Sequence, residues 1–161
     1  MLSPALLDQA ASLLDACRSR GIRLATAESC TGGLIAAALT AIAGSSDVVD
    51  RGFIAYSNEA KTELVGVPPD MIARHGAVSE AVARAMATGA LVRSRATIAV
   101  SVTGIAGPGG GSFEKPVGLI WFGLAQRDHS VAAEHHIFPG DRTAVRAAAV
   151  AQALSLIRTR L

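Results

Sequence analysis

The chain has 161 residues, the length of one ordinary domain with a substantial core. Half of the residues are apolar, but aromatic residues make up only 4%, so aromatic stacking of nucleic-acid bases is not expected. The formal net charge is +2, and the arginines do not form a run. Composition and charge therefore argue against a nucleic-acid partner.

Secretion and membrane insertion are also disfavoured. Cys17 and Cys30 are too few for a disulfide framework, which fits a reducing cytoplasm. The N-terminus has no basic leader, and no apolar run reaches the ~18 residues that span a bilayer. We expect a cytoplasmic protein with no membrane partner, and the composition also allows a homodimer.

The first half of the chain alternates helices with strands. The spacing of apolar residues, with Gly and Pro as breakers, predicts a helix at 3–20, a strand at 22–26, a helix at 31–42, a strand at 48–57 and a helix at 58–65. Ser3 is the expected cap of the first helix.

The second half continues this alternation and adds a strand pair. We expect a short helix at 71–74, a longer one from Ser79, its cap, to 93, a strand at 97–103, strands at 118–125 and 131–138, and a helix at 141–160. The strand at 97–103 is apolar throughout, which is typical of a central buried strand. This order predicts one domain, residues 1–161, with a three-layer α/β/α sandwich and a mixed sheet.

Lysine is scarce in this chain. Of 15 basic residues only two are lysines, and Lys61 lies five positions after the only tyrosine, Tyr56. Arginine cannot lose its proton in a protein, whereas a desolvated lysine can act as a base. Each residue also has an ordinary interpretation, a half-buried strand position for Tyr56 and a solvated helix position for Lys61.

Two Gly-rich segments flank this pair. Ser29 and the following residues lie at a strand-to-helix junction, where free backbone N–H groups attract anions, although a simply capped helix would look the same. The loop from Gly104 to Gly111 follows the most hydrophobic strand, where ligands collect in open α/β sheets. Its spacing matches neither G-x-G-x-x-G nor a Walker loop, which excludes the NAD and ATP interpretations.

The sequence offers no convincing metal site. His135 and His136 are adjacent on a predicted strand and should face opposite sides, and neither cysteine belongs to a C-x-x-C pair. We therefore expect a mechanism without metal or cofactor. Arg142, at the start of the last helix, could bind a phosphate bidentately or cover the helix surface.

Taken in order, these segments resemble the family of the C-terminal domain of the competence-damage-inducible protein CinA, which also occurs as a stand-alone nicotinamide mononucleotide deamidase. The matching stretches cover nearly the whole chain and are residues 26–33, 43–46, 51–53, 56–61, 76–79, 103–108, 110–111, 115–118 and 140–142. The resemblance implies an α/β/α fold and metal-independent hydrolysis of the carboxamide of nicotinamide mononucleotide to nicotinate mononucleotide and ammonia.

A neutral lysine can take the proton of a serine hydroxyl, so the nucleophile should be a serine that lies close to Lys61. Ser46 precedes the strand that delivers Tyr56 and Lys61, and we expect it to fold back over the end of that strand. Ser46 is then the nucleophile, Lys61 the base and Tyr56 the proton relay. Ser29 remains open as an alternative nucleophile.

The remaining candidates are expected to bind the nucleotide substrate. Those that shape the pocket are Ser29, Thr31, Gly32, Gly33, Thr103 and Gly104, while Arg142 holds the phosphate. Two other functions stay open at this point. One is a non-catalytic nucleotide-binding module that acts through a protein partner, and the other is an amidohydrolase for a different amide.

Overall fold

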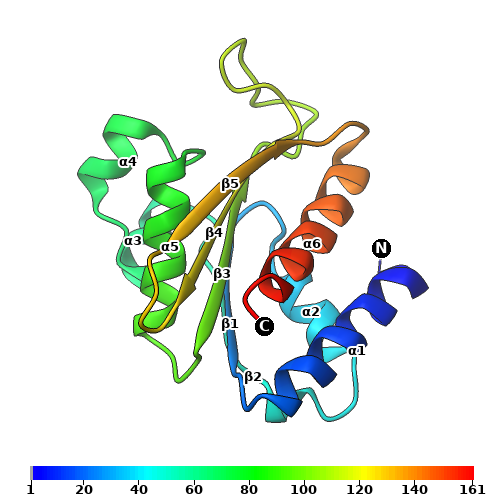
Figure 1. Ribbon diagram of the computed structural model, residues 1–161. Helices are drawn as coiled ribbons and strands as arrows, with labels where there is room; N and C mark the ends of the chain where they lie inside the picture. Colours follow the sequence, from blue (N-terminus) through cyan, green and yellow to red (C-terminus); the bar gives the residue numbers. More distant parts are fainter. Residues whose placement is uncertain (1) are drawn as a thin grey trace.

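The computed structural model describes residues 2–161 and has a mixed five-stranded sheet between two layers of helices (Figure 1). Helices α1, α2 and α6 cover one face of the sheet, and α3, α4 and α5 cover the other. The helices are α1 (Pro4–Ser19), α2 (Leu34–Thr40), α3 (Asn58–Val65), α4 (Pro69–His75), α5 (Glu80–Val92) and α6 (Arg142–Arg158). The predicted three-layer α/β/α fold is confirmed.

The sheet has the order β2-β1-β3-β4-β5. Its strands are β1 (Leu24–Glu28), β2 (Val49–Ile54), β3 (Ile98–Gly104), β4 (Leu119–Gln126) and β5 (Ala132–Ile137). The first three strands are parallel, whereas β4 and β5 are antiparallel to their neighbours. The carboxyl ends of β1, β2 and β3 therefore meet at one edge of the sheet, where ligands of such folds bind.

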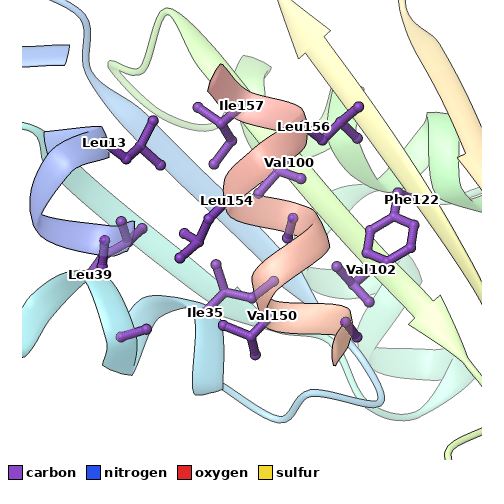
Figure 2. Close-up of a cluster of buried hydrophobic side chains, with 14 of the residues drawn as sticks. Leu13, Ile35, Leu39, Val100, Val102, Phe122, Val150, Leu154, Leu156 and Ile157 are labelled. Atoms are coloured by element: carbon purple, nitrogen blue, oxygen red, sulfur yellow. The ribbon is translucent and has the colours of Figure 1, made fainter. Parts of the chain in front are cut away.

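Two apolar clusters hold the layers together. The larger lies between the sheet and α1, α2 and α6, where Ile35, Val100 and Leu154 are each at most 1% exposed (Figure 2). Each such side chain contributes about 1.5–3 kcal/mol on burial. The opposite cluster uses smaller residues, and Gly89 of α5 packs so closely on the Val65 carbonyl that a Cβ would collide with it.

Helix starts follow local sequence signals. The side chains of Ser3 and Ser79 accept a hydrogen bond from a backbone N–H in the first turn of α1 and α5, so both predicted caps are confirmed. Helix α2 is shorter than the predicted 31–42 because the chain first makes a turn at Gly32 and Gly33, whose φ angles are +59° and +97°. Side chains rarely adopt such angles, which explains the two glycines.

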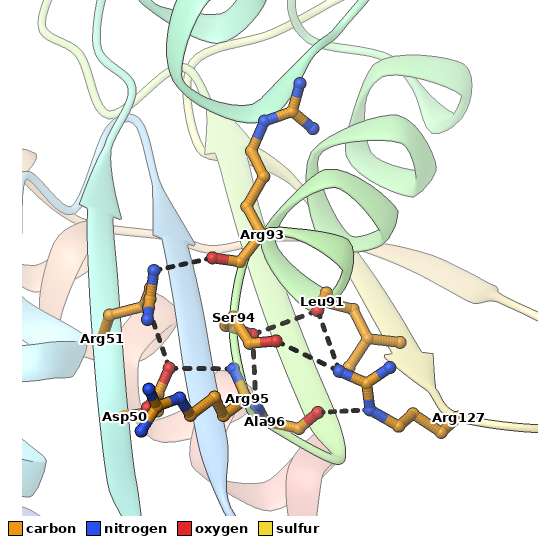
Figure 3. Close-up of polar contacts among 8 residues, drawn as sticks. All are labelled: Asp50, Arg51, Leu91, Arg93, Ser94, Arg95, Ala96 and Arg127. Carbon is orange, nitrogen blue, oxygen red and sulfur yellow. Dashed lines mark hydrogen bonds and ion pairs between the residues drawn. The ribbon is translucent and has the colours of Figure 1, made fainter.

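Polar contacts fix the loop after α5 at the other end of the sheet (Figure 3). Asp50 accepts hydrogen bonds from Arg51 and from the backbone N–H of Arg95, and this backbone bond is the main reason that its pKa is lowered. Arg127 donates to carbonyls of the same loop, including that of Ala96 at 2.9 Å. These contacts tie the loop to the start of β2 and to the end of β4, opposite the carboxyl ends of β1, β2 and β3.

Candidate active site

Most of the predicted site residues lie at the edge where the parallel strands end. Ser29 directly follows β1, Tyr56 lies just beyond β2, and Thr103 and Gly104 end β3. Glu28, the last residue of β1, pairs with the last residue of β2, so the ends of these two strands are level. The first turns of α3 bring Lys61 to the same place.

Lys61 is buried beside Ser29. Its side chain is 1% exposed, and none of the ion pairs among residues 2–161 includes it. The Nζ atom lies 3.0 Å from Ser29 Oγ and donates to the carbonyl oxygens of Ala55 and Tyr56, at 3.1 and 2.9 Å. The chain thus brings a serine hydroxyl to an amine that no carboxylate neutralises.

The surroundings favour the neutral form of this amine. Burial lowers the pKa of Lys61 below its usual value of 10.5, with a smaller opposing effect from Cys30. As an ammonium, Nζ donates to Ser29 Oγ and to the carbonyls of Ala55 and Tyr56. After loss of one proton, two N–H groups still match the two carbonyls, and the lone pair takes the place of the bond to Ser29 Oγ. The 3.0 Å contact is short enough for a proton to pass between Ser29 Oγ and Lys61 Nζ.

Cys30 is a neighbour of a different kind. It is 6% exposed, and burial raises the pKa of its thiol to about 12. A thiol with this pKa is protonated near pH 7 and is a poor nucleophile. Of the two adjacent side chains, Ser29 is the one that contacts Lys61 Nζ.

Ser46 lies elsewhere. It is exposed and belongs to the short 3-10 helix Ser45–Asp47, which precedes β2. The six residues of β2 separate it from the site by about 20 Å, at about 3.3 Å per residue. The expectation that Ser46 folds back over the end of the strand is therefore corrected, because a residue before a parallel strand lies at the opposite edge of the sheet.

Tyr56 is at the site, but its hydroxyl does not lie between Ser29 and Lys61. Its backbone carbonyl accepts the Lys61 hydrogen bond, while the side chain is 57% exposed and its Oη accepts from Arg142 Nη2 at 3.2 Å. The predicted relay is thus corrected, since the carbonyl contacts the amine and the phenol points to the mouth of the pocket.

The start of α2 is not free to bind an anion. The Glu28 carboxylate accepts hydrogen bonds from the backbone N–H groups of Gly33, Ile35 and Ala36 and from the hydroxyl of Thr31. These groups are the ones that an anion would need. The expectation of an anion at this helix start is therefore corrected, and Thr31, Gly32 and Gly33 shape the turn behind Ser29.

A hollow of about 210 Å³ lies in front of Ser29 and Lys61. It is lined by Ser29, Cys30, Tyr56, Asn58, Lys61, Ala77, Val78, Thr103, Gly104, Ala106 and Arg142. Thr103 donates its hydroxyl proton to the Ala77 carbonyl at 2.9 Å, and Gly104 is pressed against β4 with no room for a Cβ. Both predicted pocket residues thus lie on its wall.

Arg142 joins this hollow to a second one. The neighbouring hollow has about 490 Å³ and shares Ala106 and Arg142 with the first. Arg142 is exposed, and its Nη1 donates to the Gly107 carbonyl at 2.8 Å. The Arg142 guanidinium therefore lies between the hollow that contains Ser29 and Lys61 and the neighbouring one.

Five residues of the pocket wall were not among the predicted site residues: Cys30, Asn58, Ala77, Val78 and Ala106. Asn58 lies three positions before Lys61, so helical spacing alone could have placed it on the same side of α3. Ala77 and Val78 come from the loop between α4 and α5, within the matching stretch 76–79, but their place at the pocket depends on packing across the sheet.

Among residues 2–161, no group of three or more His, Cys, Asp and Glu side chains could hold a metal ion. No histidine lines the hollow that contains Ser29 and Lys61. No helix in the described residues has the length and apolarity needed to cross a membrane.

Comparison with known proteins gives matches over most of the chain, and they agree with one another. A sequence model of the CinA C-terminal domain matches residues 7–161. The chain is 52% identical to the nicotinamide-nucleotide amidohydrolase PncC of Escherichia coli K12, covering 88% of this chain and 86% of that protein. A putative competence-damage inducible protein of Caldicellulosiruptor bescii is 51% identical, but there the match covers 34% of the longer protein.

A solved structure has the same fold. The competence/damage inducible protein CihA from Agrobacterium tumefaciens superimposes with a TM-score of 0.96 at 47% identity, covering 99% of this chain and 97% of that one.

Proposed function

Because this chain belongs to the CinA C-terminal domain family, we propose that it is a nicotinamide-nucleotide amidohydrolase. It hydrolyses the carboxamide of nicotinamide mononucleotide to nicotinate mononucleotide and ammonia, a step that recycles pyridine nucleotides. The observation that carries the proposal is the buried Lys61 amine, 3.0 Å from Ser29 Oγ at the end of a hollow. The name of the relative at 52% identity supports the same chemistry.

Ser29 is the nucleophile of this proposal, and Lys61 is the base. The Ser29 oxygen forms a bond to the carboxamide carbon while its proton passes to the Lys61 lone pair. The carbon–nitrogen bond then breaks, and the leaving nitrogen takes the proton from Lys61 and departs as ammonia. An ester between Ser29 and the nicotinoyl group remains.

Water completes the reaction by the same proton path. A water molecule attacks the ester carbon and gives a proton to Lys61, and the Ser29 oxygen leaves and recovers this proton. Nicotinate mononucleotide is released and both side chains return to their first state. The exposed Ser46, about 20 Å away by the length of β2, has no role in these steps.

The substrate phosphate binds at Arg142. The guanidinium lies where the two hollows meet and is held by the Tyr56 hydroxyl and the Gly107 carbonyl. Arginine suits a phosphate because its N–H groups can make two parallel hydrogen bonds. Thr103 and Gly104 then shape the end of the pocket that receives the nicotinamide ring.

We also propose a cytoplasmic enzyme that acts as a monomer or homodimer and has no nucleic-acid partner. Both cysteines are free, and the net charge of +2 is small. Light scattering after size-exclusion chromatography measures the oligomeric state, and a constant retention volume on addition of duplex DNA is expected.

Incubation with nicotinamide mononucleotide tests the activity directly. The protein should release one ammonia for each nicotinate mononucleotide formed, with no added metal and in the presence of a chelator. Binding of the nucleotide without ammonia would favour the non-catalytic module instead. Activity lost to the chelator and restored by zinc would contradict the serine–lysine mechanism.

A further inference from the structure

The turn that carries Ser29 is held from two sides. This serine turn, residues 29–33, joins β1 to α2. Its own hydrogen bonds are few, and one of them runs from the Gly32 N–H to the Ser29 carbonyl at 3.0 Å. Side chains from outside the turn supply most of the rest.

Glu28 binds the N–H side of the turn and of the helix that follows it. Its Oε2 accepts from Thr31 Oγ1 at 2.7 Å and from the N–H groups of Gly33 and Ile35 at 3.0 Å each. Its Oε1 accepts from the Ala36 N–H at 2.8 Å. The residue is 1% exposed, so these hydrogen bonds form away from solvent.

The carboxylate also does the work of a helix cap. The N-cap residue Gly33 has no side chain to bond the first N–H groups of α2. Glu28 meets them from the preceding strand, and helix N-termini favour a negative charge at this place. The serine turn is thereby closed between the end of β1 and the start of α2.

Arg146 binds the carbonyl side of the same turn. From α6 its Nε donates to the Cys30 carbonyl at 3.1 Å, and its Nη2 donates to the Thr31 carbonyl at 3.0 Å. Glu28 thus accepts hydrogen bonds from the N–H groups, and Arg146 donates hydrogen bonds to the carbonyls. The two sets of bonds leave the turn little freedom to rotate.

We propose that Glu28 and Arg146 are positioning residues that hold the serine turn so that the Ser29 hydroxyl stays in contact with Lys61. The inference rests on the proposed function, since it concerns the geometry of that reaction. A displacement of about 1 Å between reacting groups can lower a rate by about 100-fold, which makes such support important for turnover. Neither residue takes part in bond making or proton transfer.

The experiment compares Glu28→Gln and Arg146→Met with matched controls. Glutamine places an NH₂ group where one carboxylate oxygen accepted a hydrogen bond from a backbone N–H. Two hydrogen-bond donors then face each other and that bond is lost. The control for Glu28→Gln is Ala37→Gly, which weakens α2 but keeps the backbone N–H that donates to the Gly33 carbonyl at 2.8 Å. The control for Arg146→Met is Arg158→Met, near the far end of the same helix.

Three readouts are taken for each variant: melting temperature, kcat and KM for ammonia release, and the rate at which a sulfonyl fluoride labels Ser29, followed by mass spectrometry. We expect kcat to fall about 10- to 100-fold in both test variants, with KM changed less than about threefold and labelling slowed in parallel. Both controls should keep parental kcat and labelling, even where the melting temperature falls by about 3 °C.

Parental kcat and labelling in Arg146→Met and Glu28→Gln would overturn the proposal, as would a loss confined to KM. If Glu28→Gln does not fold, Arg146→Met decides alone. If the parent protein releases no ammonia from nicotinamide mononucleotide, the proposed function fails, and the labelling rates still decide whether the two residues position Ser29.

Discussion

Lys61→Arg tests the base directly. The substitution keeps the positive charge but removes the ability to become neutral, because the guanidinium stays protonated in proteins. A general base contributes about 10²- to 10⁴-fold to a rate, or roughly 3–5 kcal/mol of activation free energy. Since Lys61 Nζ has Ser29 Oγ as its only side-chain partner among residues 2–161, we expect a loss of turnover in this range.

The chain supplies a matched control. Lys115 is the other lysine, and its Nζ donates to the His75 carbonyl outside the hollow that contains Lys61. Lys115→Arg should keep parental turnover. Steady-state ammonia release is measured for both variants, and circular dichroism with a melting curve checks that each is folded.

Near-normal turnover in a folded Lys61→Arg protein would refute the reasoning, because no neutral amine would then be needed. Equal losses in the two lysine variants would also count against it, since a general effect of the guanidinium would then explain the result.

Two further predictions concern Lys61 and Arg142. Burial lowers the pKa of Lys61, so between the folded-state pKa and 10.5 the unfolded chain binds more protons than the folded one. The free energy of unfolding should therefore rise with pH across this window. Lys61→Met should remove that rise, as measured by denaturant titrations at several pH values. A pH dependence of unfolding that is identical in parent and variant would argue against a buried, shifted lysine. Arg142→Met should raise KM for nicotinamide mononucleotide about tenfold or more while kcat falls less, because it removes a contact to the phosphate and not to the reacting atoms. An unchanged KM in steady-state kinetics would place the phosphate elsewhere.

The fold could be predicted because its signals are local. Ser3 and Ser79 lie directly before runs with helical spacing, and both cap the helices expected after them. The apolar run at 97–103 became the central strand β3. Boundaries were less accurate at α2, where two left-handed glycines extend the turn before the helix begins.

The site was predicted in part, and the error at Ser46 has a topological cause. A helix that connects two parallel strands returns the chain to the starting edge of the sheet, so a residue just before β2 lies away from its carboxyl end. This rule was available from the predicted strand-helix-strand order. The contacts of Arg146 with the serine turn were not, because they join residues 115 and 116 positions apart whose proximity depends on the packed fold.

The serine pair tests the central claim most directly. Ammonia release from nicotinamide mononucleotide is measured for Ser29→Ala and Ser46→Ala, with calorimetry for nucleotide binding and a melting curve for each. The serine–lysine account predicts that Ser29→Ala loses turnover and still binds the nucleotide, while Ser46→Ala matches the parent protein. Full turnover in Ser29→Ala together with loss in Ser46→Ala would contradict it.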